Sequence, residues 1–232
     1  RSQPRVHYGC DGFGCAAGGY VGCDGKSLVD IPTEPEQVSG LRAALERAGA
    51  ECTLEVRDET YGGIKMIERF ANLFPKTPGK VNSEAERWRK MMEFGMTICP
   101  IEKYHGEPVY KIVFIAPNEE CLTEVKRQYE SQFVFCESRL GDEGGGIVNG
   151  ELINRKFDKG TGIKAICGFL GCSLADTIGF GDSDNDLQMT DVVGISVCMA
   201  NGSDNLKKRC DRICPAVSED GVAKEFAELG LI

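Results

Sequence analysis

Residues 177–187 constrain the fold of this chain more than any other stretch, because they join a short apolar run to an acidic turn. The run reads Thr-Ile-Gly-Phe and stops at Gly181, and Asp182, Asp184 and Asp186 follow at alternate positions. A short apolar segment bounded by turn residues is typical of a buried strand. The pattern therefore predicts a strand that ends in a tight loop, and such a loop can turn several carboxylates toward one point.

The acidic turn is a candidate cation site. Carboxylates held this close repel one another unless a cation lies between them, and hard oxygen ligands suit Mg2+ or Ca2+. An EF-hand calcium loop also opens Asp-x-Asp-x-Asp, but it requires Gly at its sixth position and Glu at its twelfth. Leu187 and Val193 stand there instead, so the EF-hand is excluded. A solvated turn of Asp, Asn and Ser is the alternative to a metal loop.

Composition narrows the choice of partners. The 232 residues carry a net charge of −9, which argues against a nucleic-acid or anionic-membrane binder, since those require a basic face. A local Mg2+ or lysine can still attract an anionic substrate. No apolar run approaches the length of a membrane span, and we expect a cytoplasmic monomer. The 12 cysteines are scattered without a Cys-x-x-Cys pair, which favours reduced thiols over a zinc site or a disulfide framework.

The chain divides into three segments by its pattern of strands and helices. Residues 1–30 contain a hairpin signal at Asp24-Gly25. Residues 31–140 alternate strands with helices, two of which are predicted near 64–74 and 83–92, and this indicates an α+β unit. The glycine-rich run 141–146 is interpreted as a boundary that opens the last segment, 141–232.

The last segment has a different organisation. Short strands at 147–148 and 152–153 precede a helix that begins after Asp158, and further strands are predicted at 177–180, 193–197 and 212–217. Strands that alternate with helices through short connections indicate a parallel sheet with helices on its faces. Ligands of such sheets bind beyond the carboxyl ends of the strands, which is where the acidic turn lies.

Several motifs together resemble a known family. Lys159-Gly160 at the start of a helix, followed by Gly181-Asp182-x-x-Asn185-Asp186 after a strand, resembles motifs three and four of the haloacid dehalogenase-like (HAD) phosphatases. Val197-Cys-Met-Ala-Asn201 and Glu219-Asp-Gly-Val-Ala223 resemble the Cof-type branch. The resemblance covers nearly the whole chain and is specific in its last third. It implies an α/β fold with a Rossmann-like parallel-sheet core, built from 1–30 and 141–232, and an inserted α+β cap at 31–140 that selects the substrate.

The resemblance also implies a chemistry and a set of site residues. Members of the family hydrolyse small phosphorylated metabolites, often sugar phosphates, with Mg2+ and through an aspartyl-phosphate. By resemblance, Asp182 binds Mg2+ directly, and Asp186 binds it directly or through a water. Asn185 orients the loop or the phosphate. Lys159 supplies positive charge to the transferring phosphoryl group.

Two motifs of the family are missing from the sequence. The family opens with a strand ending Asp-x-Asp-Gly-Thr, whose first Asp is the nucleophile, and a later strand ends in a Ser or Thr, usually within Thr-Gly-Arg. Asp11 and Asp24 each precede Gly, but neither has an Asp two residues earlier. We therefore expect a member that lacks its first few dozen residues, with unpaired edges in its core sheet and no phosphatase turnover. The alternative is a non-catalytic module that binds a metal or a phosphorylated metabolite, or a decayed gene product.

Overall fold

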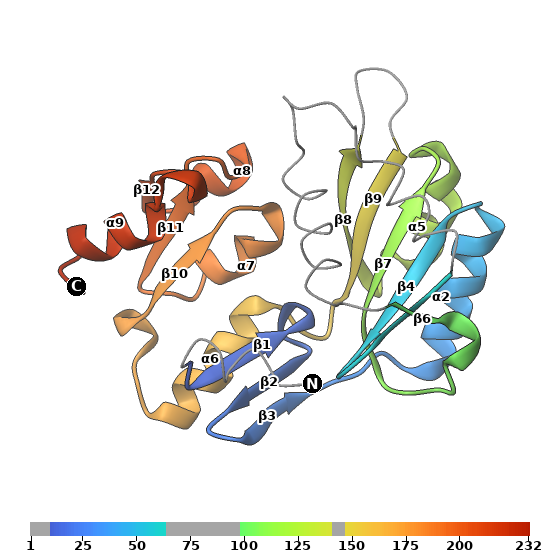
Figure 1. The fold of residues 1–232 in the computed structure, drawn as a ribbon, viewed down its shortest axis with the longest axis horizontal. Helices are drawn as coiled ribbons and strands as arrows, with labels where there is room; N and C mark the ends of the chain where they lie inside the picture. The colour runs from blue at the N-terminus through green and yellow to red at the C-terminus, as the bar shows by residue number, and fades with distance from the viewer. Residues whose placement is uncertain (1–9, 64–97, 141–146) are drawn as a thin grey trace. The chain divides into compact units, whose positions relative to one another are not determined.

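The computed structural model describes residues 10–63, 98–140 and 147–232 (Figure 1). These residues form two compact units, one of residues 31–156 and one that combines the residues before 31 with 157–232. The helices predicted near 64–74 and 83–92, and the glycine-rich run 141–146, lie outside the described residues. Within the described part, no helix combines the length and the apolar character that crossing a membrane requires.

The first unit is built on a six-stranded sheet in the order β6-β5-β4-β7-β9-β8 (Figure 1). Neighbouring strands are antiparallel except for the parallel pair β5 and β6. The strands are β4 (Glu51–Val56), β5 (Thr60–Gly62), β6 (Ile98–Pro100), β7 (Val109–Ala116), β8 (Phe133–Leu140) and β9 (Ile147–Asn154). This arrangement is the α+β unit that the alternating pattern predicts.

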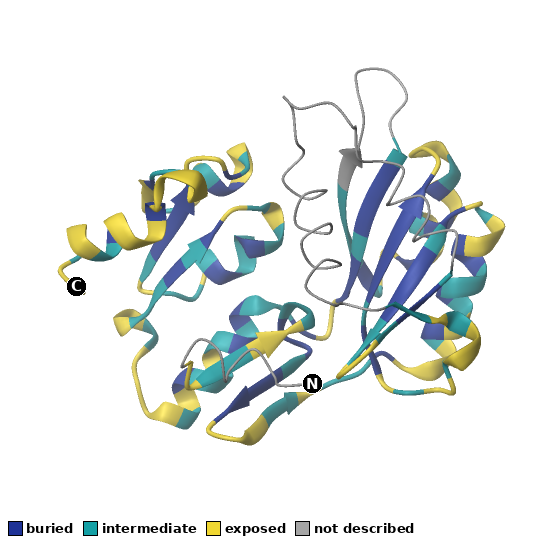
Figure 2. Cartoon of the chain, in the orientation of Figure 1, coloured by how far each residue is buried: buried dark blue, intermediate teal, exposed yellow. Residues whose placement is uncertain are grey.

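Helices α2 (Pro35–Arg47) and α5 (Thr123–Tyr129) cover one face of this sheet, and the short helices η2 (Ile101–Lys103) and η3 (Glu120–Leu122) lie in its connections. Leu41 and Leu45 of α2 are fully buried with Phe114 of β7 in one core cluster. Side chains alternate between the faces of a strand, so every second residue of β4 and β7 reaches this core. Figure 2 shows the central strands as the most buried part of the unit.

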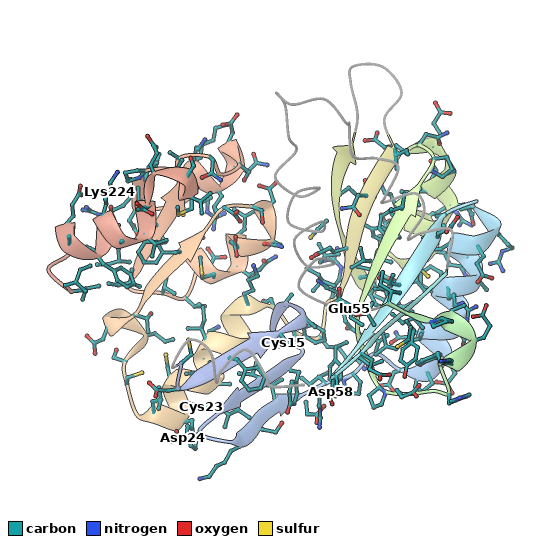
Figure 3. All side chains as sticks on the ribbon, in the orientation of Figure 1. Cys15, Cys23, Asp24, Glu55, Asp58 and Lys224 are labelled. Atoms are coloured by element: carbon teal, nitrogen blue, oxygen red, sulfur yellow. The ribbon has the colours of Figure 1, made fainter. Side chains whose placement is uncertain are left out.

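The opposite face of the sheet carries an ion-pair cluster. Lys111 Nζ lies 3.3 Å from Glu55 Oε2 and 3.1 Å from Glu151 Oε1, and these residues come from the adjacent strands β7, β4 and β9. Glu55 is labelled on β4 in Figure 3. Burial acts to lower the pKa of Lys111, but the two carboxylates outweigh it and raise that pKa above its usual value. Lys111 thus keeps its charge at neutral pH and pairs with carboxylates from both neighbouring strands.

The first unit ends later in the sequence than predicted, because it includes strand β9. The sequence predicts that the unit ends at residue 140, whereas the structure extends it to 156, because β9 pairs with both β7 and β8. Lys156, at this boundary, forms an ion pair with Glu34, near the start of the unit, at 2.9 Å. The strands predicted at 147–148 and 152–153 exist, but they complete the first sheet rather than the second unit.

The second unit begins with an antiparallel meander of β1 (Gly12–Cys15), β2 (Tyr20–Cys23) and β3 (Lys26–Asp30), with η1 (Ala16–Gly18) between the first two strands. The β2–β3 connection is the hairpin turn predicted at Asp24-Gly25. Both of its residues have positive φ, 50° and 74°, the conformation that a two-residue hairpin turn requires. Asp24 is labelled at this turn in Figure 3. The meander packs against α6 (Lys159–Leu170).

A parallel sheet of β10 (Ile178–Gly181), β11 (Ile195–Met199) and β12 (Arg212–Cys214) completes the second unit and confirms the predicted parallel architecture. Among the described residues, β10 pairs only with β11 and is an edge strand. Val197, Met199 and Cys214 form the buried centre of this sheet, and Phe180 contacts Phe226 edge-on. Its helices are η4 (Leu174–Asp176), η5 (Asp184–Asp186), α7 (Leu187–Thr190), α8 (Asp204–Lys207), η6 (Val217–Glu219) and α9 (Gly221–Glu228).

Candidate functional site

The start of α6 places Lys159 beside the acidic turn. Asp158 caps the helix, since its Oδ1 accepts a hydrogen bond from the Thr161 N–H at 2.6 Å. Gly160 lets the first turn of α6 approach the backbone of α7. A Cβ atom at this position would lie 2.7 Å from the Gln188 carbonyl oxygen, a distance that real Cβ atoms essentially never show. Lys159 therefore supplies the cation, and Gly160 allows the close packing of α6 on α7 that brings this cation to the acidic turn.

Lys159 contacts two of the three other residues assigned to the site. Its Nζ donates a hydrogen bond to Asn185 Oδ1 at 2.9 Å and forms an ion pair with Asp186 Oδ1. The Lys159 side chain is 34% exposed and that of Asp186 is 7% exposed. The lysine thus reaches inward to a nearly buried carboxylate while part of its surface stays open to solvent.

Asp186 is bonded on both oxygens. Its Oδ2 accepts the backbone N–H groups of Asp182 at 3.0 Å and Ser183 at 3.2 Å, while Oδ1 faces Lys159. Gly181 makes room for it, because a Cβ atom there would lie 2.7 Å from the Asp186 Cβ. Ser183 Oγ also donates to Asn185 Oδ1 at 2.7 Å. Asp186 therefore stabilises the turn by accepting backbone hydrogen bonds from its first two residues.

Asp182 and Asp184 point in other directions. Asp182 is exposed, and no donor among the described residues is hydrogen-bonded to its carboxylate. The Asp184 carboxylate accepts from Ser203 Oγ and, at 2.9 Å, from Asn205 Nδ2. The convergence of several carboxylates that the alternate spacing suggested does not extend to Asp184. The turn is a 3-10 helix with three residues per turn, so residues two apart project in different directions.

The acidic turn supplies some, but not all, of the oxygen ligands that Mg2+ requires. In the described part of the chain, no three or more His, Cys, Asp or Glu side chains are placed to hold a metal ion together. Mg2+, however, is commonly held by one or two carboxylates while waters and substrate phosphate oxygens fill its other positions. The exposed Asp182 and the neighbouring Asp186 supply hard oxygens of that kind. The turn therefore suits a cation that is shared with a phosphate rather than a cage made of protein ligands.

Ser183, Ser203 and Asn205 contact the site residues but were not predicted from the sequence. Ser203 precedes the short helix α8 and accepts the Leu206 N–H at 3.2 Å. A serine before a predicted helix is a recognisable capping signal. Nothing in the local pattern, however, indicates that the same hydroxyl also donates to an aspartate in the turn.

Comparison with known proteins identifies relatives of this chain. The model of the family described as haloacid dehalogenase-like hydrolase matches residues 6–226. YkrA of Bacillus subtilis (strain 168), a protein assigned to the phosphatases, is 43% identical over 129 residues, which are 56% of this chain and 46% of YkrA. The 5-amino-6-(5-phospho-D-ribitylamino)uracil phosphatase YitU of the same organism is 37% identical over 78 residues, 34% of this chain and 29% of YitU. These alignments thus span less than half of the length of both relatives.

Solved structures share the fold. A hypothetical protein from Geobacillus kaustophilus HTA426 superposes with a TM-score of 0.72 and 21% identity, covering 98% of this chain and 80% of that protein. The HAD subclass IIB sugar phosphatase BT4131 gives a TM-score of 0.72 and 19% identity, covering 98% and 79%. At these identities the likeness establishes the architecture and no more.

Proposed function

The chain belongs to the haloacid dehalogenase-like hydrolases, and from this premise we propose that its acidic turn and Lys159 bind Mg2+ and the phosphoryl group of a small phosphorylated metabolite. The observation that carries the proposal is the contact of Lys159 Nζ with both Asn185 and Asp186. A lysine, an amide and carboxylates gathered beyond the end of a parallel strand are the groups that phosphate and a hard cation require.

Each residue has a distinct part in this proposal. Asp182 ligates the cation directly, because its carboxylate is exposed and its oxygens are not hydrogen-bonded to other described residues. Asp186, whose oxygens already accept from Lys159 and from two backbone N–H groups, holds the turn closed and acts on the cation directly or through a water. Asn185 orients the phosphate or the loop.

Lys159 is the residue that acts on the phosphoryl group. Its side chain is 34% exposed, so an incoming phosphate oxygen can reach it and take up part of its hydrogen bonding. A fixed cation of this kind stabilises the charge that develops on equatorial oxygens during phosphoryl transfer. Mg2+, when bound, cancels the repulsion between an anionic nucleophile and the phosphate.

Turnover requires a nucleophile that this sequence does not present in the form typical of the family. Asp-x-Asp occurs only within the acidic turn, and no Gly-Thr follows it. We therefore propose that the 232-residue chain binds phosphate and metal but does not complete an aspartyl-phosphate cycle. A non-catalytic binding module is the second candidate, and the same missing motif favours it. A sugar phosphate is the proposed class of ligand, as the resemblance to the Cof-type branch implies.

Binding of metal and phosphate tests the proposal directly. Mn2+ binding is followed by water-proton relaxation with competition by Mg2+, and binding of inorganic phosphate in the presence of Mg2+ is followed by calorimetry. We expect Asp182→Asn to abolish Mn2+ binding, and Lys159→Met to weaken phosphate binding by roughly tenfold. Lys164→Met, an exposed lysine on the same helix, is the matched control and leaves phosphate binding unchanged. Equal phosphate affinity of the wild type and Lys159→Met contradicts the proposal.

A further inference from the structure

The middle aspartate of the acidic turn is bonded to a different part of the chain from its neighbours. Asp184 accepts one hydrogen bond from Ser203 Oγ and a second, at 2.9 Å, from Asn205 Nδ2. Both donors belong to the segment that follows β11 and begins α8. Leu206, one residue further on, is fully buried and anchors that segment. Asp184 thus links the acidic turn by hydrogen bonds to the start of α8.

The same segment also holds the backbone of Asp182. The Ser203 N–H donates to the Asp182 carbonyl oxygen at 3.0 Å, while the Asp182 N–H donates to Asp186 Oδ2 at 3.0 Å. Both peptide groups that flank the Asp182 Cα are therefore held: the one before it by Asp186, and the one after it by Ser203 at its carbonyl oxygen and by Asp186 at the Ser183 N–H. Ser203 is itself positioned, since its Oγ caps α8 by accepting the Leu206 N–H.

We propose that Asp184, Ser203 and Asn205 are positioning residues that orient the Asp182 carboxylate toward the cation, and that Asp184 is not itself a ligand. The inference rests on the proposed function, because it assumes that Asp182 binds the metal. Its physical basis is that a carboxylate held ready in place binds a cation without the entropic cost of ordering the loop. Groups that orient metal ligands in this way commonly change metal affinity by ten- to a hundredfold.

The test uses the full chain and Mn2+ as the probe, with water-proton relaxation as the readout. Asn205→Ala removes one hydrogen bond to Asp184, and Ser203→Ala removes the other together with the cap of α8. Both keep the charge of Asp184, so a loss of affinity in them cannot come from a lost charge. Asp184→Asn removes the charge and places an amide NH2 opposite one of the two donors, Asn205 Nδ2 or Ser203 Oγ, according to how the amide is turned. The double variant Asp184→Asn with Asn205→Asp restores a donor–acceptor pair and the net charge. Metal-free melting temperatures show that each variant is folded.

We expect about tenfold weaker Mn2+ binding in Ser203→Ala, Asn205→Ala and Asp184→Asn, and affinity within about twofold of the wild type in the double variant. Wild-type affinity in all three single variants overturns the inference. Loss of binding in Asp184→Asn that the double variant does not recover also overturns it, since Asp184 is then a ligand. Wild-type Mn2+ binding by Asp182→Asn refutes the proposed function instead, and so separates the two failures.

Discussion

Lys159 and Asp186 form an ion pair although 27 residues separate them in the sequence. The carboxylate is nearly buried, whereas a third of the lysine side chain is exposed. The pair joins the start of α6 to the turn after β10, and so fixes the site at the meeting point of two elements. The cation that acts on phosphate in our proposal is therefore also part of what holds the turn in place.

Replacing the two outer aspartates of the turn is expected to separate stability from metal binding. Asp186→Asn leaves Lys159 without its charged partner and lowers the free energy of unfolding by about 1–3 kcal/mol, less than for a fully buried pair because the lysine is partly solvated. Asp182→Asn alters an exposed side chain and changes stability by no more than about 0.5 kcal/mol. Urea unfolding of the metal-free proteins measures both changes. Equal losses in the two variants contradict this assignment.

Gly160 and Gly168 lie on the same helix and are expected to respond in opposite ways to alanine. A Cβ atom at 160 would lie 2.7 Å from the Gln188 carbonyl, whereas a Cβ atom at 168 meets no atom within 4 Å. Gly160→Ala is expected to cost about 1–3 kcal/mol by overpacking and to weaken phosphate binding by displacing Lys159. Gly168→Ala is expected to stabilise the protein by up to about 1 kcal/mol through helix propensity. Thermal unfolding and phosphate calorimetry distinguish the two.

Cys52 is expected to make the first unit less stable as the pH rises above 9. Burial raises the pKa of its thiol from 9.0 to about 12; the nearby charge of Arg42 acts to lower this pKa, and those of Glu46 and Glu51 add to the rise. Because the thiol ionises more readily in the unfolded chain, its contribution is complete below pH 9 and is lost as the pH rises toward 12.

Relative to Cys52→Ala, the wild type is expected to lose roughly 2 kcal/mol by pH 10.5, at about 1.36 kcal/mol per pH unit. Urea unfolding of both proteins between pH 8 and pH 10.5 measures the difference, in which the titration of all other groups cancels. A stability difference that stays constant over this range would show that the thiol titrates alike in the folded and unfolded states.

The purified 232-residue polypeptide is expected to show no Mg2+-dependent hydrolysis of p-nitrophenyl phosphate. The sequence contains no Asp-x-Asp-Gly-Thr, so no aspartate is presented as the family's nucleophile is. An identically purified Asp182→Asn variant reports the background from contaminating phosphatases. Hydrolysis by the wild type that is absent from this variant contradicts the expectation.

The elements predicted from sequence were those that local chemistry determines. The hairpin at Asp24-Gly25 follows from the backbone preferences of its two turn residues, and the strand before Asp182 follows from an apolar run that stops at a glycine. The proximity of Lys159 to Asp186 was predictable only through resemblance to a family, because no spacing rule connects residues so far apart in the sequence.

What could not be predicted depended on contacts between distant segments. Strand β9 has the same pattern whichever sheet it joins, and only its hydrogen bonds to β7 and β8 assign it to the first unit. Likewise, alternate spacing suggested convergent carboxylates, but the 3-10 turn and the donors at Ser203 and Asn205 direct Asp184 elsewhere. Neither partner of Asp184 carries a local signal for that contact.

The ion pair between Glu34 and Lys156 joins the first and last stretches of the first unit. A segment whose two ends meet can be cut out of its host gene and replaced by a short peptide link, or transplanted into another protein at a surface loop, without stretching either side of the junction. In such a chain the first unit, which the family resemblance expects to select the substrate, can be exchanged as a cassette, while the residues around Lys159 stay unchanged.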